Sequence, residues 1–354
     1  MSSTSEPVKK RILFVDDDQA ILRAIKNLLR KERDRWDLVF ASGGEAALEE
    51  VRRQHVDVVV TDMRMPAMDG ATLLTHIRRE SPATARIMLT GSAEPEAIAR
   101  ALPALHQLLV KPCDRAKLRS TIERSLDATG SGSNTAIGSI DRLPSPARTV
   151  NALARVLGTA SATPADAVAI ISADPAMAAK VLQLACSEFF TSSGTASSIG
   201  RAVSMIGLDR LRQLSAASQI FELVGAESVA PWIEVLQTRS VAGALRARLA
   251  IDDRERAELV YAAALLRFVG RSMLAMEDPV YREALAAGLS ERELQGLELE
   301  RFGGITQAEL GAWLLGLWGL PLEITELVRC QSRPELAPHE LRAFAEILHR
   351  ACEE

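Results

Sequence analysis

The sequence predicts an α/β domain with a doubly wound, five-stranded parallel sheet, followed by an all-α helical domain. Up to about Asp127, short apolar runs alternate with helical segments, which is typical of strands buried on both faces of a parallel sheet. After Leu143, strand patterns nearly vanish and helix start signals recur. The length of 354 residues suits two or three domains.

The first domain, 1–127, should contain strands and helices in regular alternation. We expect strands at 12–15, 36–41, 57–61, 86–90 and 107–110. We expect helices at 21–29, 44–53, 69–80, 95–102 and 115–126, since each range carries apolar residues at helical spacing.

A segment rich in Gly, Ser and Thr, 128–142, indicates a flexible linker. The second domain, 143–354, should hold some ten helices. Capping boxes that pair Thr163 with Asp166, Ser290 with Glu293 and Thr306 with Glu309 mark three helix starts. Asp174 followed by proline marks another.

Charged residues follow three of the predicted strands. Asp16 and Asp17 follow the first, Asp62 the third and Lys111 the fifth. The carboxyl ends of parallel strands share one rim, where open α/β sheets bind ligands. Carboxylates crowded on that rim need a cation, so a Mg²⁺ site with oxygen ligands is expected beside Lys111.

This first domain resembles the receiver domain of two-component response regulators, which has a flavodoxin-like fold. The resemblance rests on short motifs at the expected strand ends: Val15-Asp16-Asp17, Asp62 to Pro66 with Asp69-Gly70, Leu89-Thr90-Gly91 and Lys111-Pro112. Taken singly, the Asp16-Asp17 pair could be a solvated turn and Lys111 a surface lysine. The joint pattern favours the receiver.

The resemblance implies that Asp62 accepts a phosphoryl group from a sensor histidine kinase or a phosphotransfer protein. It implies that Thr90 and Lys111 contact the phosphoryl group and that the Lys111-Pro112 peptide is cis. It further implies that Mg²⁺ is held by Asp17, Asp62 and the Arg64 carbonyl, with Asp16 acting through water. Leu108 stands where an aromatic switch residue is common in the family. Whether Thr90 is coupled to the last strand in the usual way is therefore left open.

The second domain resembles the HDOD domain, a helical module related to metal-dependent HD phosphohydrolases. The resemblance runs from Leu143 to about Pro334 and rests on the segments 171–175, 180–187, 202–207 and 314–321. Its metal-ligand positions are altered: Arg267-Phe268 replaces a His-Asp pair, and Gln307, Gln331-Ser332 and Arg239-Ser240 replace positions that often carry histidine.

Arginine and phenylalanine cannot bind a divalent metal, so no cofactor and no enzymatic activity are expected in the helical domain. His55, His76 and His106 lie in the first domain. His339 and His349 lie beyond the matched segment, where we expect surface helix residues. We therefore expect a response regulator with a non-catalytic output that binds a protein or a small ligand. The alternatives are a metal-dependent phosphohydrolase output and a DNA-binding output.

Charge and hydropathy restrict the partners. The part up to Asp127 has 21 Lys+Arg and 19 Asp+Glu, and the rest has 21 and 27, so nucleic acid is disfavoured as a partner.

The apolar stretch Leu259 to Met276 is broken by arginines and indicates a buried helix instead of a membrane span. The start lacks a signal peptide pattern, which favours a cytoplasmic protein. The output partner is not indicated, and a homodimer remains an alternative.

Overall fold

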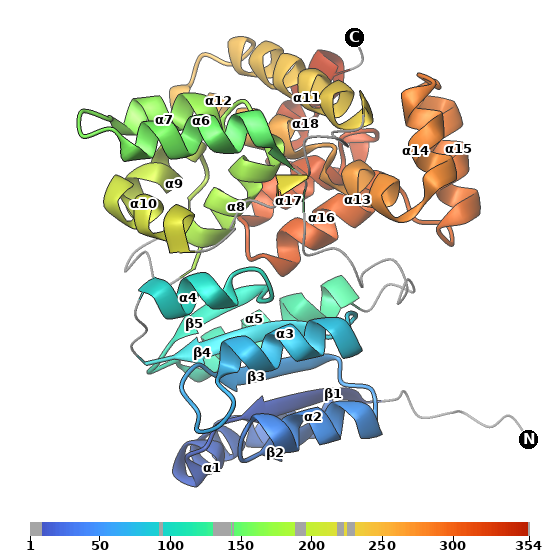
Figure 1. Ribbon diagram of the computed structural model, residues 1–354. Helices are drawn as coiled ribbons and strands as arrows, with labels where there is room; N and C mark the ends of the chain where they lie inside the picture. The colour runs from blue at the N-terminus through green and yellow to red at the C-terminus, as the bar shows by residue number, and fades with distance from the viewer. Residues whose placement is uncertain are drawn as a thin grey trace, which may run out of the picture.

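The computed structural model describes residues 9–91, 95–129, 143, 145–187, 196–217, 223–224 and 231–352. In Figure 1 the sheet domain occupies the lower part of the view and the helical domain the upper part. The predicted fold class is confirmed.

Five parallel strands form the sheet in the order β2-β1-β3-β4-β5. The strands are β1 (Lys10–Val15), β2 (Trp36–Ala41), β3 (Val58–Asp62), β4 (Ala85–Thr90) and β5 (Gln107–Val110). The helices are α1 (Gln19–Leu28), the short η1 (Arg30–Glu32), α2 (Gly44–Arg53), α3 (Gly70–Glu80), α4 (Pro95–Ala101) and α5 (Arg115–Thr129).

Alternate residues of each strand face opposite sides of the sheet, and both sides are covered by helices. Ile12 and Phe14 of β1 pack in the apolar cluster that contains residues of α1 and α5. Leu13 and Val15 pack in the cluster that contains residues of α2, α3 and α4. Burial on both faces explains why the strands appear in the sequence as nearly continuous apolar runs.

The helical domain runs from α6 to α18. Its helices are α6 (Ala147–Gly158), α7 (Pro164–Ile171), α8 (Pro175–Ala185), α9 (Ile199–Ile206), α10 (Leu208–Ala217), α11 (Pro231–Leu249), α12 (Arg254–Leu266), α13 (Val269–Glu277), α14 (Pro279–Ala286), α15 (Glu291–Arg301), α16 (Gln307–Leu317), α17 (Leu322–Arg329), η3 (Pro334–Leu336) and α18 (Arg342–Cys352). Two-residue strands β6 (Ser145–Pro146) and β7 (Leu223–Val224) pair with each other.

Local hydrogen bonds confirm the predicted helix starts. Both halves of the capping box form at the N-termini of α7, α15 and α16. Asp174 caps α8, with Pro175 in its first turn. The segment Arg254–Glu277, which comprises α12 and α13, is long and apolar enough to cross a membrane, but 83% of its most apolar window is buried inside the protein. This burial agrees with the predicted core position, but the stretch from Leu259 to Met276 forms parts of two helices instead of the single helix predicted.

Two sequence predictions need correction. Helix α5 continues to Thr129, so the first two residues of the predicted linker are helical, and 130–142 lie outside the described residues. The helical domain also has more helices than the ten or so predicted. Several breaks are tight: α12 and α13 are separated only by Arg267 and Phe268, without proline or glycine at the break.

The two domains pack directly against each other. Helix α16 contacts α5, and α10 contacts α4. One apolar cluster contains buried residues of both domains, such as Leu105 and Leu108 on one side and Val181 and Leu184 on the other. Figure 1 shows α4 and β5 on the side of the sheet domain that faces the helical domain.

Candidate functional site

The strand ends bring three of the predicted site residues together. Asp16 follows β1, Asp62 is the last residue of β3, and Lys111 follows β5. The Lys111 Nζ atom lies 2.7 Å from Asp16 Oδ2 and 2.5 Å from Asp62 Oδ1. A single ammonium group therefore bridges two carboxylates on the rim of the sheet.

The bridge is partly shielded from water. The Asp16 side chain is buried, whereas Lys111 and Asp62 are half-buried. Burial alone would lower the pKa of Lys111, but its hydrogen bonds to Asp16 and Asp62 outweigh burial and raise that pKa. Lys111 is thus held in the charged form, ready to pair with anionic groups.

The other predicted residues lie around this bridge. Asp17 and Arg64 are exposed, and the Arg64 backbone N–H donates to Asp62 Oδ2 at 2.6 Å. Thr90 is buried at the end of β4, and its carbonyl oxygen accepts from the Lys111 N–H at 2.7 Å. The Lys111-Pro112 peptide is cis, as the resemblance implied.

The loop after Asp62 depends on a glycine. The Gly70 N–H donates to the Met63 carbonyl at 2.9 Å. A Cβ atom at Gly70 would lie 2.1 Å from the Asp62 carbonyl oxygen, far inside contact distance. The Asp69-Gly70 motif therefore lets the start of α3 approach the chain at Asp62 closely, and Asp69 caps that helix.

The chemistry of this donor set fits a hard divalent cation, because the carboxylates and the Arg64 carbonyl offer only oxygen. Within the described part of the chain, no three or more His, Cys, Asp or Glu side chains converge closely enough to form a metal-binding group. The ammonium group of Lys111 contacts Asp16 and Asp62 instead. Sequence reasoning anticipated the carboxylates and the lysine but not this direct bridge.

The opposite end of β5 contacts the helical domain through polar groups that the sequence analysis missed. Gln107 Nε2 donates to the Leu317 carbonyl at 3.0 Å, and Gln183 Nε2 donates to the His106 carbonyl at 2.8 Å. Lys180 Nζ donates to the Leu102 carbonyl at 3.1 Å. All three donor side chains are buried. A polar residue within an apolar run is the only signal the sequence offers for such contacts.

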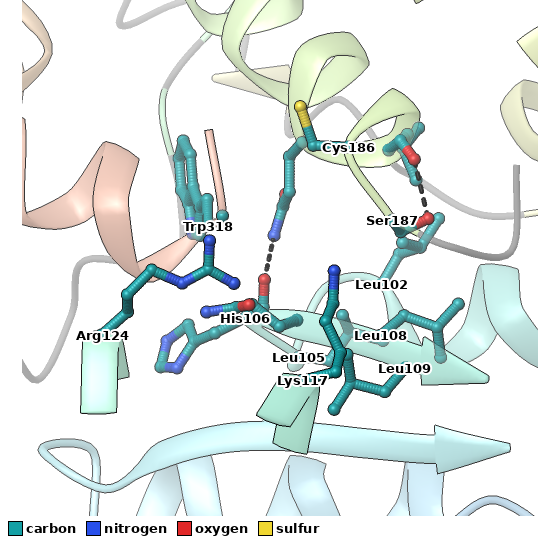
Figure 2. Close-up of a pocket in the computed structure, with 14 residues that line it drawn as sticks. Leu102, Leu105, His106, Leu108, Leu109, Lys117, Arg124, Cys186, Ser187 and Trp318 are labelled. Carbon is teal, nitrogen blue, oxygen red and sulfur yellow. Dashed lines mark hydrogen bonds between the residues drawn. The ribbon is translucent and has the colours of Figure 1, made fainter. Parts of the chain in front are cut away.

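A small cavity of about 50 Å³ lies at this boundary (Figure 2). Leu105, Leu108 and Lys117 line it from the sheet domain, and Cys186 and Trp318 from the helical domain. Leu108, at the position where a switch residue was expected, is buried and lines this cavity between the two domains.

Two family models match the chain. Residues 12–123 match the response regulator receiver domain. Residues 143–334, more than half of the chain, match the HDOD domain.

Curated relatives are similar to part of this chain. Transcriptional regulatory protein GlrR of Escherichia coli K12 is 32% identical over 117 residues, which are 33% of this chain and 26% of GlrR. Transcriptional regulatory protein ZraR of Salmonella typhimurium is 32% identical over 171 residues, which are 46% of this chain and 37% of ZraR. The chain therefore spans only about a quarter to two fifths of the length of these relatives.

Solved structures are similar to parts of this chain. A virulence factor from Campylobacter jejuni is 22% identical with a TM-score of 0.52, over 63% of this chain and 80% of that chain. The MmoQ response regulator from Methylococcus capsulatus is 24% identical with a TM-score of 0.48, over 60% and 83%. The receiver domain of an HD domain-containing protein from Pseudomonas fluorescens is 32% identical with a TM-score of 0.34, over 35% and 99%.

Proposed function

The chain belongs to the HDOD domain family and carries a response regulator receiver domain before that domain, and from this premise we propose that phosphorylation of Asp62 controls a non-catalytic helical output. Receiver domains take phosphoryl groups from histidine kinases or phosphotransfer proteins and generally use Mg²⁺. The observation that carries the proposal is the Lys111 ammonium group bridging Asp16 and Asp62 at the rim of the sheet.

In the proposed reaction, a carboxylate oxygen of Asp62 attacks the phosphorus atom of a phosphohistidine. The new O–P bond forms as the P–N bond breaks, and the histidine imidazole leaves. Lys111 and Thr90 would hold the transferred group, the lysine by charge and the threonine by its hydroxyl. Asp17, Asp62 and the Arg64 carbonyl would hold Mg²⁺, with Asp16 acting through water, and the ion would supply charge neutralisation when bound.

Strand β5 supplies a physical route from this site to the output. Lys111 directly follows the carboxyl end of β5. At the amino end, the Gln107 side chain donates a hydrogen bond to the Leu317 carbonyl of the helical domain. Four residue steps separate the two, or about 13 Å along a strand. Moving the Lys111 ammonium from the carboxylates to a phosphoryl group would therefore act on an element that already contacts the output.

The altered positions of the helical domain support a non-catalytic output. One cavity of that domain is lined by the altered positions Arg267, Phe268, Gln307, Gln331 and Ser332. In related modules these positions often carry metal ligands, whereas here they carry other side chains. We propose that this domain acts by binding a protein or a small ligand instead of by hydrolysis.

Incubation with Mg²⁺ and acetyl phosphate, followed by intact mass measurement, tests the phosphoacceptor. The chain should gain one phosphoryl group, and Asp62→Asn should abolish the gain. Asp114→Asn serves as the control, since this exposed aspartate caps the start of α5 and is not one of the residues proposed to hold Mg²⁺ or the phosphoryl group. A full gain of mass in Asp62→Asn would show that another residue is the acceptor.

A further inference from the structure

A second, larger cavity lies inside the helical domain. It measures about 270 Å³ and is bordered by the junction of α12 and α13, by α15, by the N-terminus of α16 and by α18. Five arginines and three glutamates line it: Arg267, Arg271, Arg292, Arg329, Arg333, Glu291, Glu298 and Glu309. The lining thus carries an excess of two positive charges, within a part of the chain where acidic residues outnumber basic ones.

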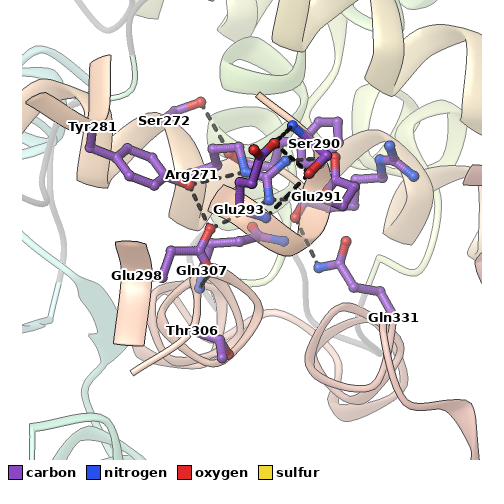
Figure 3. A network of polar contacts seen from close by, with 12 residues as sticks. Arg271, Ser272, Tyr281, Ser290, Glu291, Glu293, Glu298, Thr306, Gln307 and Gln331 are labelled. Atoms are coloured by element: carbon purple, nitrogen blue, oxygen red, sulfur yellow. Dashed lines mark hydrogen bonds and ion pairs between the residues drawn. The ribbon is translucent and has the colours of Figure 1, made fainter. Parts of the chain in front are cut away.

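The three glutamates already have partners. Figure 3 shows Arg271 beside Tyr281, Glu291 and Glu298. Arg271 contacts Glu291 at 2.9 Å and Glu298 at 3.4 Å. Glu309 closes the capping box of α16. These carboxylates hold the framework of the cavity. Of the remaining lining arginines, Arg329 pairs with Glu326, whereas Arg267, Arg292 and Arg333 make no ion pair within the described residues.

Arg267 stands out among those arginines. It is only 5% exposed, and its guanidinium group lies 3.9 Å from the centroid of the Phe268 ring. Its Nη1 donates to the Cys352 carbonyl at 3.1 Å, but its buried Nε has no hydrogen-bond partner among the described residues. Within those residues Arg267 also makes no ion pair.

Like charges surround Arg267. Arg239 and Arg271 also lie over the Phe268 ring, at 5.2 and 4.9 Å from its centroid, and both are paired with Glu291. Burial is the main cause that lowers the pKa of Arg267 to about 9, and the neighbouring guanidinium groups contribute to this lowering, whereas Glu291 opposes it. A buried cation without an ion-pair partner is costly, so an anion that enters the cavity would be favoured there.

We propose that this cavity binds a small organic phosphate of about the size of a nucleoside monophosphate, with its phosphate group on Arg267. The planar guanidinium group matches a phosphate through two parallel hydrogen bonds. The net positive charge of the lining favours a phosphate monoester, which carries nearly two negative charges near neutral pH. The volume is about nine times that of one water molecule, so it holds an organic group beside the phosphate.

The buried amide of Gln307 offers a contact for that organic group. Gln307 lines the same cavity, is 4% exposed, and its Oε1 atom has no partner in the described part of the chain. An amide oxygen accepts from an N–H or O–H donor. The structure therefore supplies a cation for the phosphate and an acceptor for a polar group elsewhere on the ligand.

Calorimetric titration of the full chain with adenosine 5′-monophosphate tests the proposal, with inorganic phosphate, adenosine and succinate as comparison ligands. We expect the monophosphate to bind more tightly than phosphate, and adenosine and succinate to bind at least about tenfold more weakly. Arg267→Met should weaken binding about tenfold or more, and Arg333→Ala at the exposed rim by a few-fold. Arg342→Ala, an exposed arginine of α18 outside the lining, should bind like the unaltered chain.

Several outcomes would overturn the proposal. They are no binding of the monophosphate at millimolar concentration, equal binding of adenosine, or unchanged binding in Arg267→Met. If Arg267→Met does not fold, as judged by circular dichroism, the few-fold weakening expected for Arg333→Ala decides in its place, and unchanged binding in that variant would overturn the proposal. This inference deepens the proposed binding role of the helical domain. The titrations use unphosphorylated protein, so failure of the cavity and failure of the Asp62 proposal remain distinguishable.

Discussion

The Gln183 side chain of α8 donates a hydrogen bond from Nε2 to the carbonyl oxygen of His106, the residue directly before β5, at 2.8 Å. The bond is buried and joins residues 77 positions apart in the chain. Together with the bond from Gln107 to Leu317, it ties the strand that precedes Lys111 to two helices of the output. Any movement of β5 must therefore be accommodated by α8 and α16.

The first prediction concerns these two glutamines. The double variant Gln107→Leu, Gln183→Leu should still be phosphorylated at Asp62, because neither residue touches the rim. Phosphorylation of the unaltered chain should change amide exchange in α8 and α16, and this change should be lost in the double variant. Gln54→Leu, an exposed position of the receiver, is the control. An unchanged exchange response in the double variant would contradict coupling through β5.

The second prediction concerns competition between Lys111 and Mg²⁺. The ammonium group contacts two carboxylates of the proposed ion site, so removing it should strengthen ion binding. We expect Lys111→Ala to bind Mg²⁺ about tenfold more tightly, or about 1.4 kcal/mol, as measured by the rise of the melting temperature with MgCl₂. Lys31→Ala, an exposed lysine, should match the unaltered chain. Equal or weaker Mg²⁺ binding in Lys111→Ala would argue against this competition.

The third prediction compares the effects on stability of alanine substitutions at two glycines, Gly70 and Gly158. Gly70→Ala places a methyl group against the Asp62 carbonyl oxygen, so we expect it to destabilise the receiver by about 2 kcal/mol or more in urea unfolding. Gly158→Ala, at the end of α6, meets nothing within 4 Å and should be neutral or slightly stabilising. Similar effects for both substitutions would show that the close approach at Gly70 is not required.

The fourth prediction concerns the pH dependence of stability. Asp174 caps α8 and is fully buried, and burial raises its pKa from 3.8 to about 6. The folded state therefore binds a proton that the unfolded state has already released between these values. This contribution to stability is complete below about pH 4 and is lost as the pH rises through about 6, by on the order of 2–3 kcal/mol.

Urea unfolding at several pH values measures this contribution. Asp174→Asn keeps a capping side chain but cannot titrate, so the decline between about pH 4 and 6.5 should be smaller in this variant. Asp253→Asn, at the exposed N-cap of α12, should keep the dependence of the unaltered chain. The prediction is wrong if both variants show the same decline.

The receiver could be predicted closely because its signals are local. The ranges 36–41, 44–53 and 107–110 agree with the ends of β2, α2 and β5. The inner strands β1, β3 and β4 are buried on both faces, so their apolar runs have clear limits, and the charged site residues lie at the ends of such runs. Asp16, Asp62 and Lys111 were therefore brought together correctly, although their direct bridge was not foreseen.

The helical domain could be predicted only in outline. The break between α12 and α13 has no proline or glycine that would mark it in the sequence. In the structure α12 packs on α17 and α13 packs on α16, and these contacts join segments distant in sequence. His349 was expected on the surface, yet it is half-buried, lines the larger cavity, and its Nδ1 lies 2.8 Å from the Gln331 carbonyl oxygen. From the sequence, Arg267 indicated only that a metal ligand of related modules is missing at this position. Its burial beside other arginines depends on contacts distant in sequence.

The shared apolar cluster at the domain boundary has a consequence for recombination. A receiver grafted from another regulator onto this output would bring different side chains to the positions of Leu105 and Leu108, and to that of Gln107, whose side chain donates to the Leu317 carbonyl oxygen. Loss of this donor from a carbonyl oxygen that stays buried costs about 1–3 kcal/mol. Chimeras of this chain should therefore need matched replacement of β5 and α16, so the two domains are not freely interchangeable parts.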